Sequence, residues 1–179
     1  MMNFKYLLAV GSFVVLTVGA TNIVNAEEIS IIIHMVDEQG ISEELGTITA
    51  EDTEYGLLLT PNLVDIPSGI HGFHLHENPS CDAGIKDGEV TPGLAAGGHY
   101  DPENTDSHEG PYGAGHLGDL PPLIADEEGV VTLPVLAPRL SQSDLEGRSL
   151  MVHLNGDNFS DQPEKLGGGG GRIACGVLE

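Results

Sequence analysis

The sequence predicts an all-β domain, built as an antiparallel sandwich or barrel. Short segments rich in β-branched and apolar residues recur along the chain, and Gly, Pro, Asn and Asp separate them. No segment keeps the apolar period of a helix over several turns. The 25 glycines and 11 prolines among 179 residues suit a fold in which many turns connect short strands.

Six segments have the composition expected of strands, and two long stretches between them do not. These stretches, residues 78–123 and 156–171, are rich in Gly and Pro, and each follows shortly after a segment that contains histidine. Long irregular loops inside a compact domain are usually functional, so we expect both to contribute to a site. The expected strands are residues 30–36, 46–49, 55–60, 72–76, 130–135 and 149–154.

Residues 1–26 have the features of a signal peptide that is removed on export. Lys5 precedes an apolar stretch at residues 7–18, and Val24-Asn25-Ala26 has the pattern of a signal-peptidase site. The alternative is a membrane anchor, but the apolar stretch is shorter than the roughly 20 residues that a spanning helix needs. The sequence therefore predicts an exported chain whose mature part, residues 27–179, forms a single domain.

The two cysteines, Cys81 and Cys175, fit this prediction of export. Disulfides persist in oxidising compartments outside the cytoplasm. Two cysteines in an exported domain most simply pair with each other, so we expect a disulfide. The alternative is that one of them supplies a thiolate ligand to a metal.

The net charge of −22, from 28 acidic and 6 basic residues, restricts the partners of the chain. Removal of Lys5 with the signal peptide would make the mature chain one unit more negative. Such a protein should bind neither nucleic acid nor an anionic membrane surface. Most of the acidic residues are best interpreted as a solvated surface. An anionic substrate would need a local region of positive potential on this negatively charged protein.

A pair of histidines indicates a metal site on the predicted strand 72–76. Residues two apart on a strand point to the same side, so His74 and His76 present both imidazoles to one face. His71 lies at odd spacing from both and should point away, into the core or behind the site. His34 stands in an apolar segment without a partner nearby, and we interpret it as structural.

Further histidines strengthen the metal interpretation. His108, His116 and Asp119 form a His-x7-His-x2-Asp pattern on a glycine-rich stretch, and His99 and His153 lie on either side of it. Neutral imidazoles with one carboxylate are the ligand types of a zinc site. Any one of these histidines alone would more simply be a surface or core residue, but that explanation is poor for the whole set.

Four motifs, in this order, resemble those of the exported bacterial copper/zinc superoxide dismutases. The resemblance directly covers about half of the mature chain. It implies a Greek-key antiparallel β-barrel of about eight strands with two long functional loops, and it implies a periplasmic location. The motifs are GIHGFHLHENPSC, AAGGHYDPENTDSHEGPYGAGHLGDLP, MVHLNGDNFSDQP and GGGGGRIACGV.

The resemblance implies one copper ion and one zinc ion per subunit. His99 would bridge the two ions as an imidazolate, with one ring nitrogen on each. The implied copper ligands are His74, His76, His99 and His153. The implied zinc ligands are His99, His108, His116 and Asp119.

The resemblance also assigns supporting roles. Asp157 would link a copper histidine to a zinc histidine, as outer carboxylates commonly do around metal ligands. His71 would be the structural histidine beneath the copper site, and Cys81 and Cys175 would form the family disulfide. Arg172 would attract and orient a small anion beside the copper.

The implied activity is dismutation of superoxide to oxygen and hydrogen peroxide by alternating reduction and oxidation of the copper, which would protect against superoxide outside the cytoplasm. Arg172 and His99 are the residues expected to take part in catalysis. The rival classes are a metal-binding protein without turnover and a dismutase that uses copper alone. The family includes dimers and monomers, so a homodimer stays open.

Overall fold

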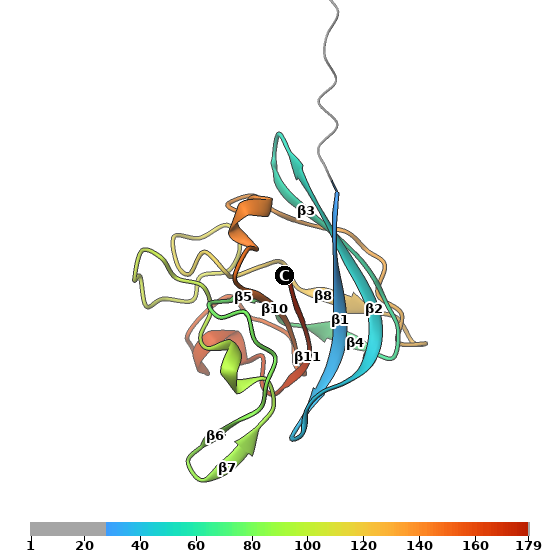
Figure 1. Cartoon of the computed structure of the whole chain (residues 1–179). Coiled ribbons are helices and arrows are strands. Elements are labelled where there is room, and N and C mark those ends of the chain that lie inside the picture. The colour runs from blue at the N-terminus through green and yellow to red at the C-terminus, as the bar shows by residue number, and fades with distance from the viewer. Residues whose placement is uncertain (1–27, 179) are drawn as a thin grey trace, which may run out of the picture.

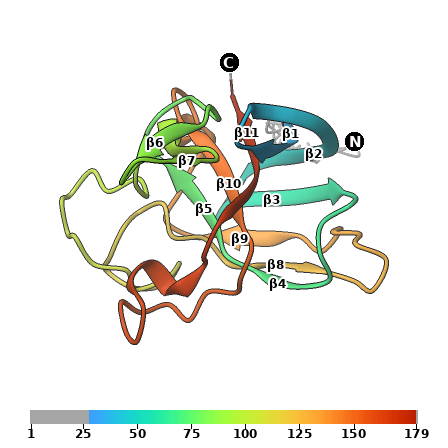
Figure 2. The ribbon, with the colours of Figure 1, turned by 90° about the horizontal axis from the view of Figure 1, so that it is seen from below.

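The computed structural model describes residues 28–178 and contains strands with three short 3-10 helices (Figures 1 and 2). The predicted signal peptide, residues 1–26, lies outside the described residues. Within these residues no helix has the length and apolar character needed to cross a membrane. The strands are β1 (Ile29–Asp37), β2 (Gly40–Thr53), β3 (Gly56–Leu63), β4 (Gly69–His71), β5 (Phe73–His76), β6 (Gly84–Lys86), β7 (Glu89–Thr91), β8 (Leu123–Ala125), β9 (Val135–Ala137), β10 (Ser149–His153) and β11 (Arg172–Val177).

Seven strands form one antiparallel sheet in the order β5-β10-β11-β1-β2-β3-β9. The late strands β10 and β11 thus lie between β5 and β1, which is the crossover of a Greek key. The sheet curls strongly, as Figure 2 shows. The all-β antiparallel prediction is confirmed.

The strand expected at residues 72–76 is longer and connects two sheets. Its first part, β4, pairs with β8, and its second part, β5, pairs with β10. Gly72 interrupts it between the two pairings, and its amide donates to the carbonyl of Asn155 at 2.7 Å. Counted as one strand, and with the small β6–β7 hairpin set apart, this gives the eight strands that the family resemblance implies.

The core follows from alternation along the strands. In β1, Ile31 and Ile33 are buried while Ile32 is 48% exposed, and Leu57 and Leu59 of β3 are fully buried. Inward apolar side chains from both sheets meet in one cluster, which removes the apolar surface from water. This cluster supports β5 from behind, where Phe73 and Leu75 belong to it.

One predicted strand is largely wrong. Most of residues 130–135 are not in a strand, and only Val131 makes an isolated bridge, to Leu63. Pro134 has no amide hydrogen to donate to a neighbouring strand, and β9 begins just after it. The prediction also missed β8 and the β6–β7 hairpin, whose strands have three residues each.

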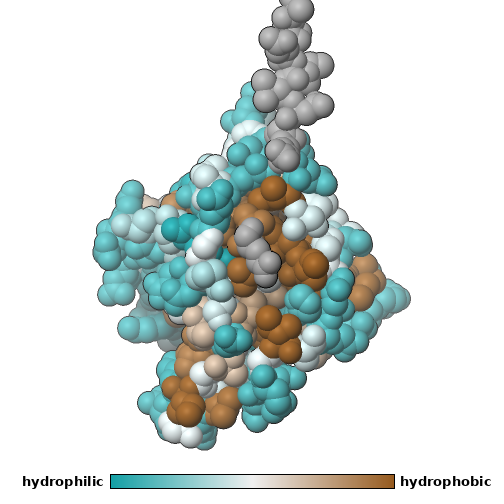
Figure 3. Space-filling view, in the orientation of Figure 1, coloured by the Kyte–Doolittle hydropathy of each residue, from teal (hydrophilic) through white to brown (hydrophobic). Residues whose placement is uncertain are grey.

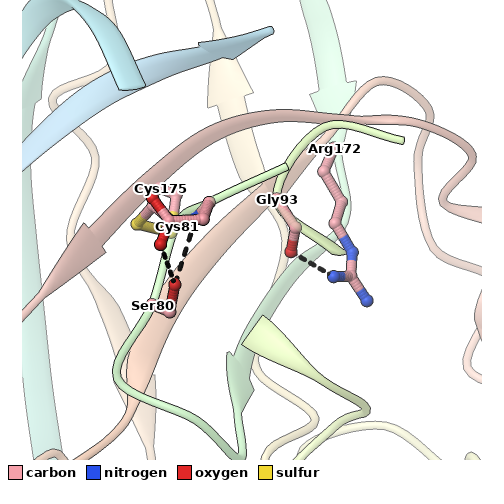
Figure 4. Close-up of a disulfide and its surroundings, with 6 residues drawn as sticks. Ser80, Cys81, Gly93, Arg172 and Cys175 are labelled. Carbon is pink, nitrogen blue, oxygen red and sulfur yellow. Dashed lines mark hydrogen bonds between the residues drawn. A yellow bond between two sulfur atoms is a disulfide. The ribbon is translucent and has the colours of Figure 1, made fainter. Parts of the chain in front are cut away.

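The two long loops are confirmed, although each contains some regular structure. The first holds the β6–β7 hairpin and the 3-10 helix η1 (Leu94–Ala96), and the second holds η3 (Lys165–Gly168). The remaining 3-10 helix is η2 (Gln142–Asp144). The predicted disulfide is present: Cys81 bonds to Cys175, and so ties the start of the first loop to β11 (Figure 4).

Candidate metal centre

Two neighbouring strands and the first long loop bring the histidines together. His74 and His76 project from β5, and His153 ends β10, which pairs with β5. Loop backbone lies along the other edge of β5, where His74 bridges to Asp119 and His76 to His99. The predicted residues therefore meet in one buried cluster: the relative exposure is 7% or less for each of His74, His76, His99, His108, His116, His153 and Asp119.

One group of ligand atoms lies within 4.8 Å of one another and belongs to His74, His76, His99 and His153. One ring nitrogen of His74 and one of His76 make hydrogen bonds to other protein groups. Nδ1 of His76 donates to the carbonyl of Gly97 at 3.0 Å, and Nε2 of His74 donates to Asp157 at 2.7 Å. Nδ1 of His153 similarly faces the carbonyl of Gly170 at 3.3 Å. The other nitrogens remain as lone pairs that converge.

The geometry of this group fits a metal ion. Nε2 of His76 and Nε2 of His153 are 3.4 Å apart. Two nitrogens bound tetrahedrally at about 2.0–2.1 Å would be about 3.3–3.4 Å apart. Nδ1 of His74 is buried and has no hydrogen-bond partner, which is costly unless a ligand satisfies it.

The second group gathers around one carboxylate oxygen. Oδ1 of Asp119 lies 2.9 Å from Nδ1 of His99, 3.0 Å from Nδ1 of His108 and 3.3 Å from Nδ1 of His116. Nδ1 of His108 makes no hydrogen bond despite this distance. Three imidazole nitrogens and one carboxylate oxygen at such separations have the donor set and spacing of a tetrahedral zinc site.

The distances between ligand atoms alone would give a slightly different second group of ligands. By mutual distance within 4.8 Å, His74 joins His99, His108 and Asp119, and His116 falls outside. Chemistry favours His116, because His74 already directs Nε2 to Asp157 and Nδ1 to the first group. His116, by contrast, points Nδ1 at the shared carboxylate oxygen.

Asp157 joins the two groups. One carboxylate oxygen is 2.7 Å from Nε2 of His74, and the other is 2.8 Å from Nε2 of His108. The amide of Phe159 donates to the same carboxylate at 2.7 Å and fixes its position. Asp157 therefore hydrogen-bonds to Nε2 of both His74 and His108, which leaves Nδ1 of each ring facing inward.

His71 lies behind the cluster rather than in it. Its Nδ1 is 2.8 Å from the carbonyl oxygen of His153, and its Nε2 is 2.6 Å from that of Pro67. Both nitrogens face protein oxygens, so none is left for a metal. The supporting role predicted from its odd spacing agrees with this position.

A cavity of about 440 Å³ opens onto the histidines. Arg172 lines it and donates from Nη2 to the carbonyl of Gly97 at 2.6 Å and from Nη1 to that of Gly93 (Figure 4). Lys86 and Lys165 line the same cavity, together with Glu164. Sequence reasoning missed Lys86, although the rarity of cations in this chain could have drawn attention to it.

Comparison with known proteins identifies the family. The sequence profile of copper/zinc superoxide dismutase matches residues 44–178. The chain is 52% identical over 147 residues to superoxide dismutase [Cu-Zn] 2 of Salmonella typhimurium, an alignment that covers 82% of this chain and 85% of that protein. It is 50% identical over 147 residues to superoxide dismutase [Cu-Zn] of Escherichia coli, with the same coverage of 82% and 85%.

The chain belongs to the copper/zinc superoxide dismutase family.

Solved structures agree with this. The Cu/Zn superoxide dismutase from Brucella abortus superposes with a TM-score of 0.84 at 50% identity, covering 86% of this chain and all of that one. A monomeric copper, zinc superoxide dismutase from Salmonella enterica gives a TM-score of 0.78 at 50% identity, with coverage of 86% and 100%. As a copper/zinc superoxide dismutase, this enzyme uses copper and zinc and acts on superoxide, and the relatives named here are bacterial.

In this superoxide dismutase the histidines of the first group are kept neutral. Burial lowers the pKa of His153 to about 4, with further lowering from His99. Burial and the neighbouring His99 likewise hold the pKa of His74 and of His76 well below the usual range. At neutral pH these rings therefore offer lone pairs rather than protons, which is the form that a metal binds.

In the second group the pKa of a histidine is raised rather than lowered. Burial would lower the pKa of His108, but the carboxylates of Asp119 and Asp157 outweigh it and raise that pKa to about 9. The pKa values of both carboxyl groups are depressed, because hydrogen bonds from histidines outweigh the effect of burial. Without a metal, a proton on His108 supplies the positive charge that this half of the site requires.

The metal-free superoxide dismutase should lose stability as the pH rises from about 6.5 to about 9. The pKa of His108 is raised from 6.5 to about 9, so its contribution to folding is complete below pH 6.5 and is lost as the pH passes through about 9. Urea unfolding of the chelator-treated chain at several pH values measures this. Asp157→Asn removes one of the two carboxylates that hold the proton and should reduce the loss. A stability that does not change with pH, or an equal loss in the variant, would contradict the assignment.

Proposed function

We propose that the two groups are a copper site and a zinc site that share His99. The observation that carries this proposal is the arrangement of lone pairs: His99 directs Nδ1 to Asp119, which leaves Nε2 for the first group. The proposed copper ligands are His74, His76, His99 and His153, and the proposed zinc ligands are His99, His108, His116 and Asp119.

Each protein group has a definite task in this proposal. A copper ion held there would supply two accessible oxidation states for the transfer of an electron between two superoxide molecules. Carbonyl acceptors hold the Nδ1 hydrogens of His76 and His153 and keep Nε2 aimed inward. Nε2 of His99 can hold a proton for the product, because Asp119 faces its Nδ1 at 2.9 Å. Asp157 holds a histidine of each site, His74 and His108, in a fixed relative position.

Arg172 is proposed to bind and orient superoxide. Its guanidinium borders the same cavity as His76, His99 and His153. The carbonyls of Gly93 and Gly97 hold it by two donor nitrogens, which fixes the charge before the substrate arrives. A cation held in advance in a partly buried cavity stabilises an anion more strongly than a mobile surface cation does.

Two other classes explain less. A metal-binding protein without turnover gains nothing from an arginine fixed in an open cavity beside the ligands. A dismutase that uses copper alone would leave the buried cluster of His108, His116 and Asp119 without a purpose. The complete set of residues therefore favours an enzyme with both metals.

Superoxide dismutation by the purified chain from Glu27, oxidised and loaded with both metals, tests the proposal. His153→Ala should abolish the activity that depends on copper, because it removes one of four ligands. Arg172→Ala should lower kcat/KM roughly 10- to 100-fold through loss of local attraction, while Arg172→Lys should retain part of it. Tight binding of both metals without dismutation above that of free copper would instead establish a metal carrier.

Local positive charge should offset the acidic surface near the copper. Residues 28–178 contain five lysines and arginines, and three of these line the cavity: Lys86, Lys165 and Arg172. At physiological salt the Debye length is about 8 Å, so distant carboxylates are largely screened from the cavity. We therefore propose that these cations, rather than the net charge, control the approach of superoxide.

The rate of dismutation should consequently fall as ionic strength increases. Lys86→Gln and Lys165→Gln should each lower kcat/KM at low salt and flatten its dependence on salt, because each removes one attracting charge. Glu164→Gln, at the same cavity, is the matched control and should act in the opposite direction. A rate that increases with salt in the wild-type enzyme would mean that net repulsion dominates.

Residues 1–26 are proposed to be a cleaved signal peptide and residues 27–179 the mature dismutase domain. The motivating observations are the apolar stretch after Lys5 and the site at Val24-Asn25-Ala26. The periplasm is the proposed location, and removal of superoxide formed outside the cytoplasm is the proposed role. N-terminal sequencing of the exported protein should begin at Glu27, and an uncleaved, membrane-bound chain would contradict this.

A homodimer stays a prediction. Apolar side chains gather on the face shown in Figure 3, over β1 and β11 and at the β6–β7 hairpin. Ile32 of β1 and Ile41 of β2 are about half exposed, and together with Val177 of β11 they line a shallow cavity. Such a surface suits a second copy, whereas the Salmonella enterica relative is described as monomeric. Sedimentation equilibrium distinguishes the two states.

A further inference from the structure

Arg139, just after β9, holds the loop that carries half of the metal cluster. Its guanidinium donates to four backbone carbonyls of that loop. Nε donates to Pro111 at 3.1 Å, and Nη1 donates to Gly115 at 3.0 Å. Nη2 donates to Gly110 at 3.3 Å and to His116 at 2.5 Å. No other arginine in residues 28–178 makes as many hydrogen bonds to a single loop.

These four backbone carbonyls need a hydrogen-bond donor. All four residues are buried, and residues 110–116 belong to no strand or helix that could satisfy their carbonyls. The loop's own backbone bonds are few: Gly113 donates to Gly110 at 3.4 Å, and His116 donates to Ser107 at 2.9 Å. A buried carbonyl without a donor destabilises the fold, so the guanidinium does here what a neighbouring strand does elsewhere.

The contact reaches the metal cluster directly. The carbonyl of His116 accepts from Arg139 and also from the amide of Asp119, the latter at 3.3 Å. His116 and Asp119 point side chains at each other within 3.3 Å. The position of Arg139 therefore fixes the backbone of two residues whose side chains form the second group, and His108 begins the same loop.

The charge of Arg139 is not used in an ion pair. Asp101 and Glu103 line the same small cavity as Arg139. Nevertheless, among residues 28–178 all ion pairs within 4.0 Å join histidine to aspartate, and none involves this guanidinium. In a chain with 28 acidic residues, an arginine that bonds only to carbonyls is placed for its planar set of five donors rather than for its charge.

We propose that Arg139 is the positioning residue of the zinc half of the site, and that it sets the affinity for zinc while leaving copper binding nearly unchanged. The inference rests on the proposed assignment of His108, His116 and Asp119 to zinc. Lysine should replace the arginine only in part, because one ammonium group cannot reach all four carbonyls. The copper ligands other than His99 come from β5 and β10, which Arg139 does not contact.

Zinc binding to the copper-free, disulfide-intact chain tests this, with competition by a chelator to measure the dissociation constant. Arg139→Met, which keeps the length of the side chain, should weaken zinc binding about 10- to 100-fold, as losses in the outer shell of metal sites commonly do. Arg139→Lys should lie between Arg139→Met and the wild type. Copper binding, measured with copper alone, should change much less. Cobalt in place of zinc should lose its tetrahedral visible spectrum in Arg139→Met.

Arg148→Met is the matched control. Arg148 also donates to two backbone carbonyls, those of Asp144 and Glu146, and its guanidinium lies 3.6 Å over the ring of Tyr100. It makes no hydrogen bond to the carbonyls of residues 110–116, so it separates the loss of these carbonyl contacts from the loss of an arginine as such. Unchanged zinc affinity in Arg139→Met, an equal loss of zinc and copper, or an equal loss of zinc in Arg148→Met would each overturn the proposal. If the wild-type chain itself binds no zinc, the proposed zinc site fails, which is a separate result.

Discussion

The structure depends on the burial of six imidazoles in one small volume. Each ring has two nitrogens, and a buried nitrogen without a partner is costly. In these rings one nitrogen hydrogen-bonds to a protein oxygen, and the other faces the ligand atoms of the neighbouring rings. His76 uses Gly97, His153 uses Gly170, and His74 and His108 share Asp157. Most of these oxygens lie on loops, so the loops have to be as well fixed as the strands.

Several ties provide that rigidity. The disulfide of Cys81 with Cys175 attaches the first loop to β11, and Asp161 accepts from the amides of both His108 and Leu166 and so joins the two loops. Arg139 and Arg172 serve the same end, because both donate to backbone carbonyls of the first loop. In an acidic chain the scarce guanidinium groups thus support irregular backbone instead of pairing with the abundant carboxylates.

The sequence predicts well what depends on local pattern. β-Branched and apolar composition identified β1 and much of β3, and the spacing of His74 and His76 placed both on one face and His71 on the other. It failed where tertiary contacts decide: Pro134 ended a segment whose composition suggested a strand, and the three-residue strands β6 and β7 were too short to detect. Arg139 and Lys86 carried no motif, since their importance comes from residues distant in the chain that folding brings beside them.

The disulfide connects the strand that carries Arg172 to the loop that holds its guanidinium. Cytoplasmic thiols are kept reduced, so a newly made chain lacks the bond between β11 and the start of the loop that includes Gly93 and Gly97. Those two carbonyls are the acceptors that hold Arg172. Once formed, the disulfide covalently links β11, which begins at Arg172, to the loop whose carbonyls hold the Arg172 guanidinium.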